Sequence, residues 1–299
     1  MLRAGPTDPS PSAARLTAAF LRACALDVAV RKPGNVSLAS PGHGMQAAQF
    51  LASAAAAAGP LLQAGTPVGQ RMDAAGAASW AVTGCNTNLG ILLLCAPLAA
   101  AAQQVRGACT APKLQHALQA VLAGLTVDDA RAAYRAIHRA NPGGLGRVDA
   151  QDVQSAPSIN LRAAMALAAH RDSIARQYAN GFTDLFQRAI ALLDPGLLPL
   201  AADGQAPPGT TRQVQRVWLA CLAAEPDAHI VRKHGEALAH TVMCAAQPWQ
   251  QRIEAGVVVD SDPAFAAWDA SLKQQGLNPG TSADFTVLAL FAAGLLDSA

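Results

Sequence analysis

Apolar residues recur at helical spacing near the start of the chain, between Ser12 and Arg31. Positions three and four apart share one face of an α-helix, so the pattern predicts an amphipathic helix with a buried side. The helix should end before Pro33, because the residue preceding a proline avoids helical backbone angles, and Gly34 follows. The apolar positions on the buried side are Leu16, Ala19, Phe20, Ala23, Leu26 and Val30.

Helical periodicity continues along the rest of the chain. A strand-like run of β-branched residues is found only at 256–259, and no repeat period is present. The pattern predicts an all-α fold, a single-domain multi-helix bundle over residues 13–299 in which small Ala and Gly residues allow close helix contacts, preceded by a disordered tail at 1–12. The further helical windows are 45–58, 68–82, a helix starting at the 83–90 motif, 113–123, 127–139, 159–179, 181–193, 212–223, 227–246, 263–274 and 282–296.

Four polar islands interrupt the helices, and the first lies at residues 83–90, directly before the apolar run 91–98. Two interpretations are open. The asparagines close the first turn of a buried helix, or the free N–H groups and positive dipole end of that helix bind an anion such as phosphate. The residues assigned to binding in the second interpretation are Asn86, Thr87, Asn88 and Gly90.

The second island is Arg31-Lys32-Pro33-Gly34-Asn35, at the end of the first predicted helix. Cations at a helix C-terminus also suit the helix dipole, so capping is one interpretation. In the other, Lys32 contacts a phosphate while Gly34 lets a ligand approach the backbone. His43, between two glycines, is expected in an exposed loop, although a nearby nucleotide would also suit it.

The third and densest island spans 227–236 and holds three histidine or lysine side chains, an arginine and two acids. If Pro226 starts a helix, helical spacing places four of these residues on one face, with Asp227 in the first turn. A solvated charged face is the ordinary interpretation. The chain is poor in charge, however, which favours a functional role. The residues on that face are His229, Arg232, Lys233 and Glu236, with His234 beside them.

The fourth island, 278–284, precedes the last predicted helix. Ser282 or Thr281 is expected to cap that helix, with Asp284 as a first-turn acid; the same groups could instead hold a phosphate or Mg²⁺. Two further groups of acids stand apart from the islands. Asp149 and Asp152 follow a glycine turn at 143–146, and Asp172 is expected to pair with Arg176 one helical turn later.

The composition and the absence of several motifs exclude some classes of function. Hydrophobic residues make up 52% of the chain and charged residues 14%, with a net charge of +2 that is too small to suggest binding to nucleic acid or to a membrane surface. The six cysteines show no paired spacing and are expected to be buried free thiols in a reducing cytoplasm. The apolar runs are too short to span a membrane, no signal peptide is recognisable, and no Walker loop, dinucleotide-binding or nucleophile-elbow motif occurs. These features suit a protein that binds a polyphosphate together with a divalent cation.

The four islands, in this order, resemble the triphosphoribosyl-dephospho-CoA synthase family. This resemblance implies an all-α enzyme that attacks the N-glycosidic bond of ATP with the 2′-hydroxyl of dephospho-CoA and releases adenine. On this hypothesis the cofactors are ATP and Mg²⁺, and the partners are a nucleotide and a cofactor precursor, with a homodimer left open. The nucleotide-binding residues are Lys32, Gly34, Asn35, Asn86, Thr87, Asn88, Gly90, Arg232, Lys233 and Ser282; the catalytic residues are Asp227, His229, His234 and Asp172; the metal ligands are Asp227 and Asp284.

The chain departs from the family pattern in three places. The 83–90 loop lacks a family histidine and lysine, the acid expected after Gly34 is absent, and His43 with Met45 only loosely matches the next motif. The residue sequences of the first and third islands are more similar to those of a divergent branch of the family, which is associated with tetrahydromethanopterin-type C1 metabolism. Two alternatives follow: a transferase acting on a pterin or methanofuran-type precursor, or a non-catalytic nucleotide- or cofactor-binding protein.

Overall fold

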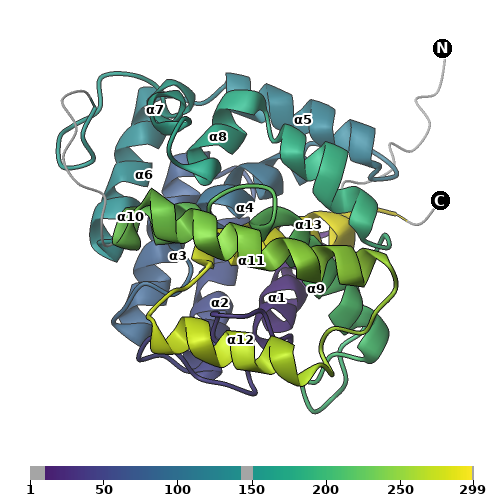
Figure 1. Ribbon diagram of the computed structural model, residues 1–299. Coiled ribbons are helices and arrows are strands. Elements are labelled where there is room, and N and C mark those ends of the chain that lie inside the picture. Colours follow the sequence, from purple (N-terminus) through teal and green to yellow (C-terminus); the bar gives the residue numbers. More distant parts are fainter. Residues whose placement is uncertain (1–10, 143–150, 298–299) are drawn as a thin grey trace.

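The predicted all-α class is confirmed by the computed structural model, which describes residues 11–142 and 151–297 (Figure 1). Over these two ranges there is no strand, only two isolated β-bridges in the loop after the first helix. The helices in chain order are α1 (Ala13–Ala29), α2 (Ala47–Leu62), α3 (Val68–Thr83), α4 (Leu89–Ala102), α5 (Ala111–Ala123), α6 (Val127–Ala140), α7 (Leu161–Ala168), α8 (Ser173–Asn180), the short η1 (Leu185–Ala189) and η2 (Ile190–Leu192), α9 (Pro208–Leu222), α10 (Ala228–His234), α11 (Glu236–Glu254), α12 (Pro263–Gln274) and α13 (Gly280–Leu295).

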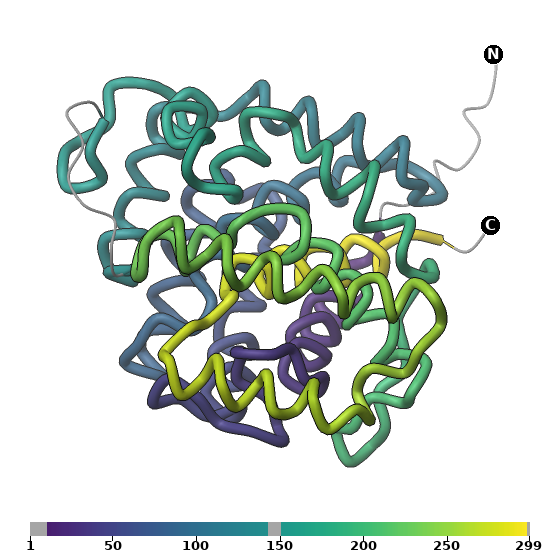
Figure 2. The backbone as a smooth tube through the Cα atoms, in the orientation of Figure 1, coloured from purple at the N-terminus to yellow at the C-terminus, as the bar shows by residue number. Residues whose placement is uncertain are grey.

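Two helices, α4 and α13, form the centre of the bundle. Both are largely apolar, and most of their residues are buried, as expected for helices enclosed by others. They pack against each other, α1 and α9 cover α13, and α3 and α5 cover α4. Figure 2 shows α13 in the interior of the molecule, behind α11. The N-termini of α4 and α13 therefore lie inside the fold, where they can shape a site.

A second apolar cluster joins α9 to the later helices α10, α11 and α12. Its centre is aromatic: Trp218 and Phe265 have no exposed surface, and the rings of Trp249 and Trp268 stack at 6.3 Å between centroids. This cluster holds α10 and α11 across the face of the molecule on which α12 also lies (Figure 1).

Two of the predicted helices are each divided in two. The window 159–179 is interrupted after α7, and Asp172 caps the new helix α8 instead of lying inside a helix. The window 227–246 is interrupted at Gly235, whose φ of 90° is available to glycine at little cost. Asp227 caps α10, and Glu236 belongs to α11 instead of the α10 face.

Two other local predictions are corrected. The window 181–193 forms only a π-helical turn followed by a 3₁₀ turn. The segment 256–259 is not a strand, because it has no strand to pair with among the described residues; Val259 packs in the core while Val258 remains 58% exposed.

All six cysteines are free, as predicted. Only Cys24, Cys95 and Cys109 are buried, whereas Cys244 is exposed and the remaining two are half-buried, so the expectation of burial holds in part. The helices within residues 11–142 and 151–297 include none with the length and apolar character needed to cross a membrane.

Close helix contacts at small residues are found where α3 meets α6. A Cβ atom at Gly69 would lie 2.3 Å from the Asp129 carbonyl oxygen and 2.5 Å from its Cα. The Gly69 N–H also donates to Asp129 Oδ1 at 2.8 Å. Since the obstacle is backbone, a side chain at this position would push the two helices apart.

The substitution Gly69→Ala should lower the free energy of unfolding by about 1–3 kcal/mol through overpacking. The matched control is Gly59→Ala in α2, where no neighbouring atom lies within 4 Å of the position that the added methyl carbon would take; it should raise the free energy of unfolding by up to about 1 kcal/mol. Urea denaturation of both variants checks this, and equal effects would contradict the close α3–α6 contact.

Candidate functional site

A cavity of about 760 Å³ opens between the start of α4, the helix α10, the start of α13 and the loop after α1. Its size falls in the range of small-molecule sites. Segments that are far apart in the sequence meet there. The sequence-predicted residues that line it are Asn35, Asn86, Thr87, Asn88, Gly90, Asp172, His229, Arg232, Lys233 and Asp284.

The loop before α4 forms one wall, and its side chains are anchored to the protein. Asn86 Oδ1 accepts a hydrogen bond from the Leu89 N–H at 3.1 Å, which caps the start of the helix. Thr87 donates to Ser53 Oγ at 2.8 Å, and Asn88 Nδ2 donates to Ser79 Oγ at 3.0 Å. The capping interpretation thus has direct support, and the other two bonds anchor this cavity-lining loop to α2 and α3.

The position of α10 depends on the carboxylate of Asp227. Its Oδ1 accepts from the N–H groups of His229 and Ile230, and its Oδ2 accepts from both the N–H and the hydroxyl of Ser282. Burial raises the pKa of Asp227, while these hydrogen bonds partly oppose the rise. The carboxylate joins α10 to α13, and with both oxygens occupied it is not placed to bind metal or substrate.

The cavity side of α10 is basic. Arg232 donates to Asp172 Oδ2 at 2.9 Å, and its buried Nε has no partner in the part of the chain that the structure describes. Lys233 is exposed at the rim and has no ion-pair or hydrogen-bond partner among those residues. Arg171 lines the cavity as well. Several positive groups therefore face one space with part of their charge uncompensated.

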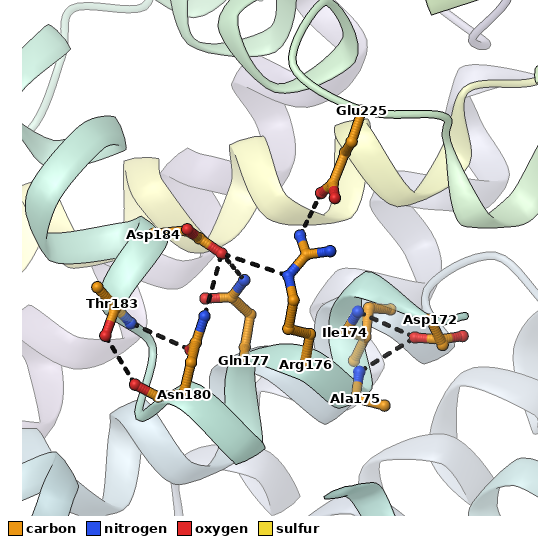
Figure 3. Close-up of polar contacts among 9 residues, drawn as sticks. All are labelled: Asp172, Ile174, Ala175, Arg176, Gln177, Asn180, Thr183, Asp184 and Glu225. Carbon is orange, nitrogen blue, oxygen red and sulfur yellow. Dashed lines mark hydrogen bonds and ion pairs between the residues drawn. The ribbon is translucent and has the colours of Figure 1, made fainter. Parts of the chain in front are cut away.

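The predicted Asp172–Arg176 pair is not formed (Figure 3). Asp172 Oδ1 accepts from the N–H groups of Ile174 and Ala175, so this carboxylate caps α8 while its second oxygen binds Arg232. Arg176 points away and donates to Glu225. The helix break at 169–172 is the reason, since it makes Asp172 the N-cap of α8. The Arg176 N–H still donates to the Asp172 carbonyl oxygen at 2.9 Å, but the carboxylate is turned toward the N–H groups of the first turn.

His229 is the one ring on α10 that lies deep in the cavity wall. Its Nε2 is buried without a hydrogen-bond partner among the described residues. Burial lowers the pKa of His229 to about 3, with further lowering by Lys233, Arg232, His43 and His234. The imidazole is therefore neutral at physiological pH, with one nitrogen available to a ligand.

Two carboxylates, Asp27 and Asp284, face the basic side chains. Asp284 has no hydrogen-bond partner over the described ranges, and burial raises its pKa well above the usual value, with the charges of Asp27 and Asp227 adding to the rise. A Cβ atom at Gly90 would lie 2.0 Å from Asp284 Oδ2, so only glycine leaves room for this carboxylate beside α4. Asp284 lies in the second turn of α13, because that helix begins at Gly280.

The residues of the second island that directly follow α1 form bonds within the protein. Lys32 has no exposed surface, and its Nζ lies 3.0 Å from Asp27 Oδ1, an ion pair inside the protein. The Gly34 N–H donates to Asp269 Oδ1, and Asn35 Nδ2 donates to Asn278 Oδ1 at 2.6 Å. Of the second-island residues 31–35, only Asn35 lines the cavity, where its Oδ1 is buried without a partner among the described residues.

Several predicted residues lie away from the cavity. Lys32 and Gly34 do not line it, Ser282 and Asp227 line a second, smaller cavity, and His234 is exposed outside both.

His43 is half-buried instead of exposed, since its Nε2 is 2.7 Å from the Gly34 carbonyl oxygen and it lines the cavity. Asp152 also lies on the cavity wall, while Asp149 and the turn at 143–146 lie outside the described residues.

Sequence reasoning missed Asp27 and Asn278. A signal for Asp27 was present: it is the single acid on the apolar side of the first helix, and an acid at such a position is rarely buried without a purpose. Asn278 stood in the fourth island as a turn residue and gave no further signal.

Magnesium fits part of this arrangement. No group of three or more His, Cys, Asp or Glu is placed to hold a metal ion within residues 11–142 and 151–297. Mg²⁺ in nucleotide sites commonly uses one or two carboxylates together with substrate phosphates. Asp284, which lines the cavity and has no hydrogen-bond partner among the described residues, meets that requirement; Asp227, whose two oxygens are occupied, does not.

Comparisons with known proteins agree with the resemblance. The family model of CitG, described as ATP:dephospho-CoA triphosphoribosyl transferase, matches residues 13–299. The fold is similar to the crystal structure of a proposed triphosphoribosyl-dephospho-CoA synthase from Archaeoglobus fulgidus, with a TM-score of 0.61 and 22% identity, covering 82% of this chain and 97% of that one. At this identity the likeness shows a shared fold. No curated protein matches the sequence.

The substitution Asp284→Asn should stabilise the protein. Because the pKa of Asp284 is raised in the folded state, wild type loses stability as the pH rises above the unfolded value of about 4. An isosteric amide removes that loss, so the variant should gain more than about 1 kcal/mol in free energy of unfolding at about pH 8 and little at about pH 4.

The control for this measurement is Asp128→Asn, at a side chain that is 83% exposed; it should change the free energy of unfolding by less than about 0.5 kcal/mol at either pH. Denaturant titrations at both pH values give the comparison. A destabilised Asp284→Asn variant at high pH would show that the carboxylate is compensated in the folded protein.

Proposed function

Because the chain belongs to the CitG family of ATP:dephospho-CoA triphosphoribosyl transferases, we propose that its cavity between α4, α10 and α13 is the active site. The protein is a transferase of that family, which moves the triphosphoribosyl group of ATP to dephospho-CoA. In this reaction adenine is the proposed leaving group.

The observation that carries the proposal is the opposition of charge inside one cavity. Arg232, Lys233 and Arg171 supply positive charge that suits a triphosphate, while Asp27 and Asp284 supply negative charge across the same space. Transfer of a ribosyl group develops positive charge at C1′ as the bond to the base breaks, and carboxylates stabilise such centres in glycosidic chemistry. A single substrate with an anionic triphosphate and a reacting carbon that becomes cationic would complement both the basic and the acidic side of the cavity.

In the proposed reaction the 2′-hydroxyl oxygen of dephospho-CoA forms a bond to C1′ of ATP. The bond between C1′ and N9 breaks, and its electron pair leaves with adenine, which takes up a proton. His229 is neutral and has a buried Nε2 without a partner among the described residues, so it accepts the hydrogen bond and then the proton of the attacking hydroxyl. Binding of a triphosphate would offset the nearby cations and raise the pKa of His229.

Asp27 and Asp172 have distinct proposed roles. Asp27, held by Lys32, stabilises the positive charge at C1′. Asp172 orients the Arg232 guanidinium toward the phosphates through their 2.9 Å contact. Mg²⁺ would be held by Asp284 together with phosphate oxygens of the nucleotide, where it would neutralise phosphate charge. The rigid amide-rich loop at Asn86–Gly90 is proposed to contact the nucleotide through its backbone.

Six free cysteines are typical of a reducing compartment, which supports a cytoplasmic enzyme with small-molecule substrates. The homodimer stays a prediction.

Incubation with ATP, Mg²⁺ and dephospho-CoA should release adenine in equal amount to a triphosphoribosyl adduct of dephospho-CoA, measured by chromatography and mass spectrometry. Omission of dephospho-CoA is the control and should abolish adenine release. Adenine formation only with a pterin or methanofuran-type acceptor would support the alternative substrate. Absence of adenine with every acceptor would contradict the proposed reaction.

The substitution Lys233→Ala should raise the KM for ATP about 10-fold, because it removes an uncompensated positive charge at the cavity rim. The matched control is Lys113→Ala in α5, an exposed lysine outside the cavity, which should leave the KM unchanged. The KM for ATP at two salt concentrations is the readout, and the difference between variant and wild type should shrink at high salt. Equal values for both variants would exclude Lys233 from triphosphate binding.

A further inference from the structure

A second cavity of about 370 Å³ lies between α8, the π-helical turn η1, α9, α11 and the start of α13. It borders the main cavity at Ile174, which lines both. Ile174 is also close to the reacting centre proposed above, since its Cδ1 would lie 2.8 Å from a Cβ atom at Gly90. The two cavities are therefore neighbours that share the Ile174 side chain as part of their walls.

The lining of this second cavity does not suit phosphate. Arg176 is already paired with Glu225 and lies 3.8 Å from Asp184. Acids outnumber cations around the cavity, so a polyanion would be repelled. The charged residues that line it are Arg176, Arg188, Asp184, Glu225, Asp227 and Glu254. An uncharged ligand is favoured, and the apolar contribution of Ala220, Leu192 and Phe285 points to one with hydrocarbon segments.

One buried polar group in this cavity lacks a partner. Gln177 is only 1% exposed, its Nε2 donates to Asp184 Oδ2 at 2.6 Å, and its Oε1 has no hydrogen-bond donor among the described residues. Figure 3 shows the Gln177 side chain held in place beside Arg176 and Asp184. A buried carbonyl oxygen left unpaired is unfavourable, and a ligand with an N–H group would satisfy it. The π-helical turn at Leu185–Ala189 adds a backbone irregularity of the kind common at functional sites.

We propose that the second cavity binds the pantetheine arm of dephospho-CoA, with Gln177 Oε1 accepting a hydrogen bond from one of its amide N–H groups. The arm is uncharged, alternates hydrocarbon with amides, and is attached to the same molecule whose hydroxyl reacts in the main cavity. This inference rests on the proposed function and adds to it a site that distinguishes the acceptor from ATP, because ATP carries no such arm.

The test compares binding of dephospho-CoA with that of ADP, which lacks the arm, by isothermal titration calorimetry on the full chain. Wild type should bind dephospho-CoA at least about 10-fold more tightly than ADP. Ala220→Phe, which fills the cavity from α9, should remove this preference and leave ATP affinity unchanged. Ala237→Phe, an exposed position of α11 outside both cavities, is the matched control and should preserve the preference.

Two further variants keep the test decisive. If Ala220→Phe does not fold, Ala224→Phe blocks the same cavity from an exposed position. Gln177→Leu should weaken dephospho-CoA binding while ADP binding stays the same. Retention of the preference by a folded, cavity-blocking variant would overturn the inference, as would a wild type with no preference. Because binding is measured without turnover, a failure of adenine release would count against the proposed reaction alone.

Discussion

The site depends on one buried carboxylate. Asp227 accepts hydrogen bonds from the start of α10 and from Ser282 in the first turn of α13, and these contacts fix the two helices relative to each other. Helix α10 has only two turns and could not hold a fixed direction alone. The carboxylate thereby sets where His229, Arg232 and Lys233 lie with respect to Asp284. A residue that does not contact substrate thus determines the geometry of the residues that we propose do.

The fold then maintains a charge arrangement that costs stability. Asp284 is half-buried near Asp27 without a hydrogen-bond partner in the described part of the chain, and His229 is kept neutral beside cations. Groups of this kind are expected at functional sites, where an unfavourable environment in the free protein is relieved by a ligand. Gly90 is part of the same arrangement, because any side chain there would displace the Asp284 carboxylate.

Long apolar helices were predictable because their pattern is strong: α4, α13 and α1 follow directly from apolar runs and their polar flanks. The breaks at Asp172 and Gly235 were not, since a single glycine or capping acid inside a helical pattern has a local effect that periodicity does not register. The convergence of Asn86 and His229 on one cavity was anticipated from their motifs, whereas Lys32, which was expected to join them, does not line it. The pairing of Lys32 with Asp27 required the end of α1 to be known in three dimensions, because a side-chain direction decides it.

The central claim is that the opposed charges of one cavity receive the triphosphate and the ribose of the same nucleotide. A crystal structure of the protein with ATP and Mg²⁺, in the absence of acceptor, tests this most directly. The account predicts electron density for the triphosphate against Arg232 and Lys233, with C1′ of the ribose on the side of Asp27 and Asp284. Density for the nucleotide in the smaller cavity, or on the surface away from α10, would contradict it.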